Sequence, residues 1–186
     1  MQAAAVILAA GGSTRFGSPK QLARLGDRTM LETVVELAHG AGLAPIIAVV
    51  PPGIATPDGV MPVVNEEPLA GLSRSLRLGL AAVPPKVGAA LILLGDQPTV
   101  SPDVLTQLLR ARGSRPIVAA RAAGLLGPPV LLERRAFGMA AATTGDQGLR
   151  DLIRGNRHLV TPVEVGEHAP DVDTPADLAS LVDGRR

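Results

Sequence analysis

Short apolar runs recur along the chain and alternate with segments in which apolar residues repeat every three or four positions. Three of the runs, 3–10, 46–50 and 89–94, are almost wholly apolar. Such runs predict buried strands of a parallel sheet, whereas the spacing in 30–40 and 72–83 predicts amphipathic helices. Strands that alternate with helices indicate an α/β fold with a mainly parallel sheet.

Local signals mark where some of these elements begin and end. Thr29 and Glu32 have the spacing of a capping box, and Ser101 before a proline is a typical N-cap, so each site predicts the start of a helix. Two further short strands are expected at 116–120 and 130–132. The segment 124–129 is rich in glycine and proline and is expected to be a loop between them.

The first apolar run opens into a glycine-rich and basic stretch, 11–20. Such a stretch at the carboxyl edge of a sheet presents backbone N–H groups to an anion, and Arg15 and Lys20 add positive charge. The stretch fits neither the Walker A pattern nor the dinucleotide fingerprint, because its lysine and its glycines are spaced differently. The pattern predicts a site for a polyphosphate.

This stretch resembles the signature L-A-A-G-x-S-x-R-x-G-x-x-K of the MobA-like nucleotidyltransferases. All eight fixed positions match: Leu8, Ala9, Ala10, Gly11, Ser13, Arg15, Gly17 and Lys20. The resemblance implies a single domain over residues 1–186 with a three-layer α/β/α, Rossmann-like sheet of the nucleotide-diphospho-sugar transferase type. It implies nucleotide binding by Leu8, Ala9, Ala10, Gly11, Gly12, Ser13 and Lys20, with Arg15 and Lys20 as catalytic cations.

A second polar turn, Gly95-Asp96-Gln97-Pro98, follows the third apolar run. Ligands of open α/β sheets lie at the carboxyl ends of the strands, so Asp96 is placed to hold Mg²⁺ opposite the phosphate loop. Taken alone, such a turn is more often structural. Asp173 is a second candidate carboxylate, although it also lies at a helix start where it can serve as a cap. The resemblance extends to both positions and implies that magnesium binds Asp96, with Asp173 close to the metal.

Two more segments are similar to the same family. Asn65, Gly71 and Ser75 match a loop and helix that face the nucleoside, and Asn65 is either a base or ribose contact or a turn residue. The segment 145–150, with Gly145, Asp146, Gly148 and Arg150, matches a loop near the acceptor, although it also fits a helix N-cap followed by a surface arginine.

Within the family, Leu8-Ala9-Ala10-Gly11 is most similar to the molybdenum cofactor cytidylyltransferases. That branch implies Mg²⁺-dependent transfer of CMP from CTP to a phosphorylated, pterin-type acceptor, with release of pyrophosphate and delivery to a molybdoenzyme or its maturation chaperone. One departure concerns the acceptor: where the branch usually carries R-G-H-P-V, this chain has Leu126-Gly127-Pro128-Pro129-Val130.

Three alternatives stay open. A GTP-using guanylyltransferase would share every catalytic residue. A cytidylyltransferase for another small phosphate is also compatible, since Pro19-Lys20-Gln21 is similar to that branch. A non-catalytic nucleotide-binding protein is the third, but both Lys20 and Asp96 are present.

The composition limits the classes of partner that the chain is expected to bind. The chain has 186 residues, a net charge of +1, no cysteine and only two aromatic residues, both phenylalanine. Single-stranded nucleic acid binding depends on aromatic stacking, and no apolar stretch is long enough for a membrane span, so neither partner is expected. The lack of cysteine suits a reducing cytoplasm. The three histidines have no metal-ligand spacing and are expected to face solvent.

Overall fold

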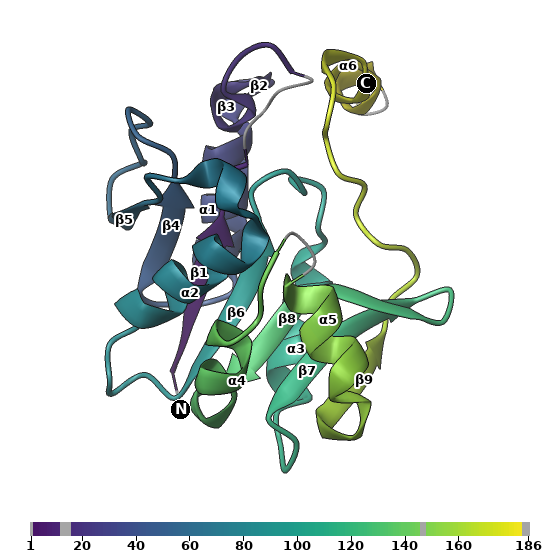
Figure 1. The fold of residues 1–186 in the computed structure, drawn as a ribbon. Helices are drawn as coiled ribbons and strands as arrows, with labels where there is room; N and C mark the ends of the chain where they lie inside the picture. Colours follow the sequence, from purple (N-terminus) through teal and green to yellow (C-terminus); the bar gives the residue numbers. More distant parts are fainter. Residues whose placement is uncertain (1, 12–15, 146–147, 184–186) are drawn as a thin grey trace.

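In the computed structural model, residues 2–11, 16–145 and 148–183 are described, and seven strands form one sheet in the order β5-β4-β1-β6-β8-β7-β9 (Figure 1). A separate two-stranded hairpin lies beyond one end of this sheet. The strands are β1 (Ala3–Leu8), β2 (Arg24–Leu25), β3 (Arg28–Thr29), β4 (Ile46–Val50), β5 (Val60–Val64), β6 (Ala89–Leu94), β7 (Ile117–Ala122), β8 (Leu125–Glu133) and β9 (Val160–Glu164).

The sheet is mainly parallel. β1 pairs in parallel with β4 and β6, and β5 continues the parallel set beyond β4. β8 is antiparallel to both of its neighbours, so β7 and β9 run in the same direction as β6. As a result, the ends of β1, β4, β6 and β9 and the β7–β8 hairpin meet at one edge of the sheet. Loops from distant parts of the sequence can therefore combine there.

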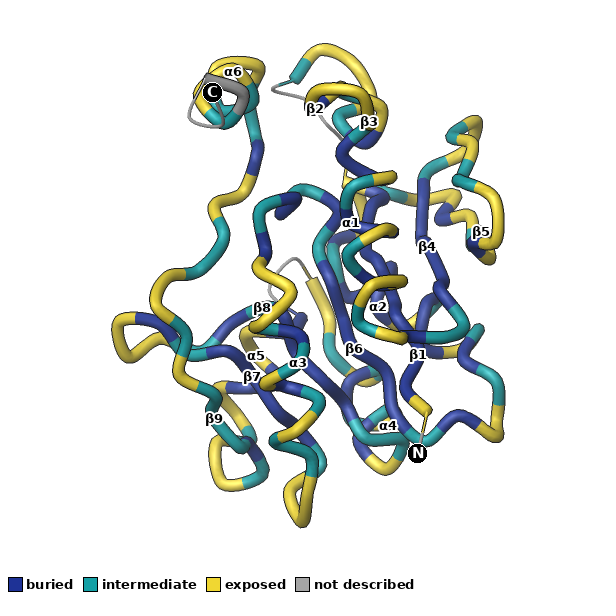
Figure 2. Tube along the Cα trace, turned by 180° about the vertical axis from the view of Figure 1, so that it is seen from behind, coloured by how far each residue is buried: buried dark blue, intermediate teal, exposed yellow. Residues whose placement is uncertain are grey.

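Helices cover both faces of the sheet and give three layers. One core cluster joins the sheet to α2 (Leu72–Ala82), α4 (Phe137–Ala141) and α5 (Gly148–Gly155) on the face seen in Figure 1. A second cluster joins the other face to α1 (Met30–Gly40) and α3 (Pro102–Arg110). The central strands β1, β4 and β6 are almost wholly buried (Figure 2), whereas the edge strands β5 and β9 are not. The α/β class with a mainly parallel, Rossmann-like sheet is confirmed, whereas the extent of the domain, 1–186, stays a prediction.

The last helix, α6 (Pro175–Asp183), lies apart from the sheet and beside β2 (Figure 1). An extended segment joins it to β9, so the chain returns from the far edge of the sheet to the end of β1. None of the helices in the described parts of the chain has the length and apolar character needed to cross a bilayer.

Most predicted boundaries agree with the structure. The Thr29–Glu32 capping box is formed, and the Ser101 hydroxyl accepts a hydrogen bond from the backbone N–H of Asp103.

The loop expected at 124–129 is wrong, because most of this segment belongs to β8 and pairs with β7 from Ala122↔Leu125 to Ala120↔Gly127. The register then shifts, so that Pro128 and Pro129 fall at an irregularity of the ladder, where a missing N–H donor is tolerated. The turn of the hairpin is made by Ala123 and Gly124, both with positive φ.

Candidate active site

The end of β1 forms the floor of the site. Ala9 and Ala10 are buried, and the Ala9 N–H donates to Val49 O across 2.8 Å. The Gly95 N–H donates to Leu8 O across 2.9 Å and joins the end of β6 to the same place. Of the predicted phosphate-loop residues, Gly12, Ser13 and Arg15 lie outside the described residues, so their roles stay predictions.

Gln21 is a residue of this floor that sequence reasoning did not assign to the site. Its side-chain amide is buried and donates to Ala9 O at 2.5 Å and to Gly11 O at 3.2 Å. Gln21 therefore holds the backbone on both sides of Ala10. Its position directly after Lys20 was the signal available, but a glutamine after a lysine does not by itself indicate burial.

Three charged side chains from distant parts of the sequence converge beside this floor. The Lys20 ammonium lies 2.7 Å from Asp96 Oδ2 and 3.2 Å from Asp173 Oδ1. The 3-10 turn Lys20–Leu22 presents the lysine, the turn after β6 presents Asp96, and the segment before α6 presents Asp173. The structure thus brings together three residues that the sequence predicted for one site.

Two hydrogen bonds hold the Asp173 segment against the β6 turn. The Val172 N–H donates to Asp96 O across 2.8 Å, and Gln97 Nε2 donates to Asp171 Oδ1 across 2.9 Å. The start of α6 is capped by Thr174 and Asp177, which exchange side-chain and backbone hydrogen bonds. The capping box therefore uses residues 174 and 177, while the Asp173 carboxylate reaches Lys20.

Burial and charge act in opposite directions on these groups. Burial raises the pKa of the Asp96 carboxyl, and the positive charge of Lys20 only partly offsets this effect. Burial lowers the pKa of the Lys20 ammonium, but attraction to Asp96 and Asp173 outweighs it and leaves this pKa above its ordinary value. At neutral pH the lysine is therefore charged and offsets part of the negative charge of the two carboxylates.

The donor set fits a small, hard divalent cation that also binds phosphate. Two carboxylate oxygens already converge on one positive group, and Mg²⁺ typically binds one or two carboxylates together with substrate phosphates. Within the described residues there is no group of three or more His, Cys, Asp or Glu side chains that could hold a metal without a substrate. Asp96 and Asp173 therefore suit a metal that arrives with a nucleotide.

Asn65 directly follows β5, and its N–H donates to Val50 O at the end of β4 across 2.8 Å, while Gly71 and Ser75 lie at the start of α2. Asn65 is fully buried; its amide donates to Ser75 Oγ at 3.0 Å and accepts from the Glu67 N–H and from Arg74 Nε. These bonds fix the turn before α2, where Gly71 adopts a φ of +93°. A contact from this loop to a nucleoside stays a prediction, and the side chain of Asn65 already acts as a turn residue.

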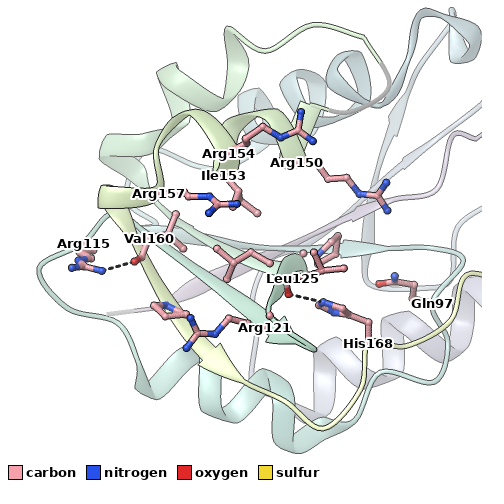
Figure 3. A pocket seen from close by; sticks show the side chains of 15 residues that line it. Gln97, Arg115, Arg121, Leu125, Arg150, Ile153, Arg154, Arg157, Val160 and His168 are labelled. Atoms are coloured by element: carbon pink, nitrogen blue, oxygen red, sulfur yellow. Dashed lines mark hydrogen bonds between the residues drawn. The ribbon is translucent and has the colours of Figure 1, made fainter.

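A cavity of about 620 Å³ begins at Gln97, next to Asp96, and extends along β7, β8 and α5 (Figure 3). Five arginines line it: Arg115, Arg121, Arg150, Arg154 and Arg157. Of these, only Arg150 was predicted near an acceptor. Residues 150, 153, 154 and 157 all line the cavity, and their spacing of three and four was the sequence signal for one helical face.

The segment that departs from the family pattern also lines this cavity, at Leu126, Gly127 and Pro128. Arg121 lies directly opposite Leu126 in the β7–β8 register. His168 is half-buried rather than facing solvent, and it packs beside Gly127. Its Nε2 donates a hydrogen bond to Leu125 O across 3.1 Å. An arginine and a histidine thus lie next to the altered segment, although they come from other strands and loops.

Comparisons with known proteins agree with this geometry. The model of the MobA-like NTP transferase domain matches residues 5–162. Rv0371c from Mycobacterium tuberculosis H37Rv is 33% identical, with a TM-score of 0.85 over 98% of this chain and 99% of that one, and a second structure of it is a complex with manganese. The 2-C-methyl-D-erythritol 4-phosphate cytidylyltransferase of Thermus thermophilus, at 20% identity and a TM-score of 0.78, covers 98% of both chains and shares the fold.

Among curated relatives, the bifunctional protein GlmU of Rhodospirillum rubrum is 32% identical over 114 residues, which are 59% of this chain. The match spans about a quarter of that relative's length. Because the family model covers most of the sheet and both loops of the site, the chain belongs to the MobA-like NTP transferase family and is a nucleotidyltransferase domain.

Proposed function

We propose that this protein transfers CMP from CTP to a phosphorylated acceptor and releases pyrophosphate. The observation that carries the proposal is the cluster of Lys20, Asp96 and Asp173 at the mouth of the β1 loop. The cluster combines one cation suited to polyphosphate with two carboxylates suited to a metal, directly beside a floor of backbone groups. This combination serves phosphoryl chemistry, which depends on positioning and charge stabilisation.

The residues would divide the work as follows. Backbone N–H groups of 10–13 hold the triphosphate, and Arg15 and Lys20 neutralise charge on the departing pyrophosphate. Asp96 and Asp173 would hold Mg²⁺, which would supply positive charge next to the α-phosphate under attack. To neutralise pyrophosphate, Lys20 exchanges its carboxylate partners for phosphate oxygens when nucleotide and metal bind. A phosphate monoester is already largely dianionic at neutral pH, so the acceptor needs no general base.

The choice of CTP rests on the floor of the site. Ala10 is buried, and Gln21 bonds the carbonyls of both of its neighbours, so the backbone there has little freedom to move away from a base. With no tryptophan or tyrosine in the chain, shape and hydrogen bonds rather than stacking decide which base fits. A methyl group at position 10 leaves less room for a purine than a glycine would.

For the acceptor we propose molybdopterin or its molybdenum form, in the cytoplasm, with a molybdoenzyme or its maturation chaperone receiving the product. This part rests on the similarity of Leu8-Ala9-Ala10-Gly11 to the molybdenum cofactor cytidylyltransferases, while the loops at 93–98 and 171–175 resemble the MobA-like family as a whole. The arginine cavity beside Asp96 is compatible with an anionic acceptor.

The test is pyrophosphate release from each of the four ribonucleoside triphosphates with Mg²⁺, with and without molybdopterin. We expect release with CTP that depends on molybdopterin and is lost in Asp96→Asn. Asp58→Asn, an exposed carboxylate in the turn before β5, serves as the matched control and should retain activity. Release with GTP alone would transfer the assignment to a guanylyltransferase, and the lack of release with any triphosphate would contradict the proposal.

A further inference from the structure

The cavity beside Asp96 carries a large excess of positive charge. The described residues that line it include five arginines and His168 and no acidic side chain. Arg121 pairs with Glu164, and Arg154 lies 3.6 Å from Asp151, but these pairs lie at the exposed rim. Within the described part of the chain, the guanidinium groups of Arg150 and Arg157 have neither an ion pair nor a hydrogen bond, in contrast to those of Arg121, Arg154 and Arg115. Unneutralised guanidinium groups around a hollow indicate an anionic ligand.

The positive charge is spread along the cavity and is not gathered at one point. Arg150 and Arg157 are seven residues apart on one side of α5 and the turn after it, which corresponds to roughly 10 Å along a helix axis. Figure 3 shows Arg150 on the side of Gln97, and Arg157 and Arg115 toward the opposite end. One phosphate cannot contact both ends, so the cavity is matched to an elongated ligand or to two anions.

Gln97 links this cavity to the reacting centre. Its side chain is buried, and Nε2 is engaged by Asp171, but Oε1 has no hydrogen-bond partner among the described residues. A buried acceptor without a donor is costly, and Gln97 lies in the wall of the cavity next to Asp96. A donor group on the ligand, such as a hydroxyl or an N–H, would satisfy this oxygen.

From these observations we propose that the acceptor carries two anionic groups at opposite ends. One is the phosphate that reacts beside Asp96, and the other binds at Arg157 in the distal part of the cavity. Arg154, one turn before Arg157 and held only by an exposed pair with Asp151, lies next to this end and adds its charge. Arg154 and Arg157 then select acceptors by their second charge. This inference rests on the proposed function for the identity of the first phosphate, but the distal site itself is defined by the arginines alone.

The experiment compares three probes that differ at one end. Hexane-1,6-diol bisphosphate carries a second phosphate, 6-(phosphonooxy)hexanoate a carboxylate, and hexyl phosphate no second charge. Calorimetric titrations use the full chain with Mg²⁺ and α,β-methylene-CTP, whose α–β bridge cannot be cleaved. We expect the bisphosphate to bind about tenfold tighter than hexyl phosphate or better, as expected for added charge-assisted hydrogen bonds. A carboxylate arm that binds as tightly would identify the distal group as any anion and not phosphate alone.

Variants assign the effect to its residues. Arg154→Gln/Arg157→Gln should remove most of the advantage of the bisphosphate and leave the affinity for hexyl phosphate within about twofold, because the proximal contacts are unchanged. Arg157→Gln alone repeats the test with one exposed side chain if the double variant unfolds. Arg110→Gln, an exposed arginine at the end of α3 on the other face of the sheet, is the matched control and should change neither affinity.

The inference is overturned if the bisphosphate binds no tighter than hexyl phosphate, if the double variant weakens both probes equally, or if Arg110→Gln has the same effect. A separate titration with α,β-methylene-CTP alone tests the proposed function. Loss of nucleotide binding with retained bisphosphate selectivity would overturn the proposed function and support the distal anion site. Nucleotide binding without selectivity for the bisphosphate would support the proposed function and overturn the distal anion site.

Discussion

A Cβ atom on Gly95 would lie 2.7 Å from the Cβ of Ala9, which is closer than two such atoms can approach. The same glycine donates its N–H to Leu8 O, so the ends of β1 and β6 are in direct backbone contact. This contact places the residue after Gly95, Asp96, beside the loop that follows Ala9. The distance between the two loops of the site therefore depends on the lack of a side chain at position 95.

We expect Gly95→Ala to push the two strand ends apart and to displace Asp96. Because a small displacement of a reacting group can lower a rate by about 10², turnover should fall by that order, and the melting temperature should fall as well. Gly138→Ala is the matched control, since a Cβ there meets no atom within 4 Å. Normal turnover in Gly95→Ala would show that the strand ends can separate without cost to the site.

Asp96→Asn and Asp173→Asn test the two carboxylates. Asp96 is the less exposed of the two and lies closer to Lys20, so its loss should abolish turnover, whereas Asp173→Asn should reduce it less. Asp173→Asn should keep the stability of the wild type within about 1 kcal/mol, because the cap of α6 is made by Thr174 and Asp177. Mn²⁺ affinity and turnover are the measurements. Activity of Asp96→Asn within about tenfold of the wild type would remove Asp96 from the metal site.

Lys20→Ala should separate catalysis from metal binding. Without the ammonium, Asp96 and Asp173 lose the cation that lies between them, so Mn²⁺ should bind the nucleotide-free protein more tightly. The kcat should nevertheless fall by about 10² or more, since charge on pyrophosphate is no longer neutralised. Lys86→Ala, at an exposed lysine, is the control. A raised KM for nucleotide with unchanged kcat would limit Lys20 to ground-state binding.

As the pH falls, the metal should leave this site at a higher pH than it leaves a site made of ordinary carboxylates. Burial raises the pKa of Asp96, and a metal binds only its ionised form, so Mn²⁺ affinity should fall as the pH drops through this raised pKa. For the metal-free protein the sign is opposite, because the folded state binds this proton more readily than the unfolded state does, and the contribution of Asp96 to stability decreases as the pH rises. Mn²⁺ titrations between about pH 4.5 and 7.5 check the first effect. Constant affinity over that range would contradict it.

Ala10→Gly tests the choice of base. Removal of the methyl group enlarges the space beside a backbone that Gln21 holds in place, so the preference for CTP over GTP should shrink by about ten- to a few hundred-fold without inverting. The measurement is kcat/KM for both nucleotides with one acceptor. If the wild-type protein has an equal or higher kcat/KM for GTP than for CTP, the cytidylyltransferase assignment is wrong, while the nucleotidyltransferase class still holds.

Local patterns in the sequence are enough to predict most of the elements and the end of the sheet where the site lies. Apolar runs such as 46–50 and 89–94 coincide with β4 and β6, because burial on both faces demands continuous apolar side chains. The helix starts at Thr29 and Ser101 depend on hydrogen bonds within three residues, which a local pattern specifies. Lys20 and Asp96 could be predicted as site residues because their loops follow apolar strands, and Asp173 because it precedes the start of the last helix.

The contacts that these residues make depend on the folded chain. The strand nature of 124–127 depends on pairing with β7, and β-pairing overrides local glycine and proline content. Burial of Gln21 and Gln97, and the convergence of arginines from β7, α5 and two connecting segments on one cavity, arise from contacts between residues far apart in the sequence. Asp173 reaches Lys20 across 153 positions because hydrogen bonds to Asp96 and Gln97 hold its segment against the β6 turn. Such contacts cannot be predicted from local patterns, because they join residues that come together only when the chain folds.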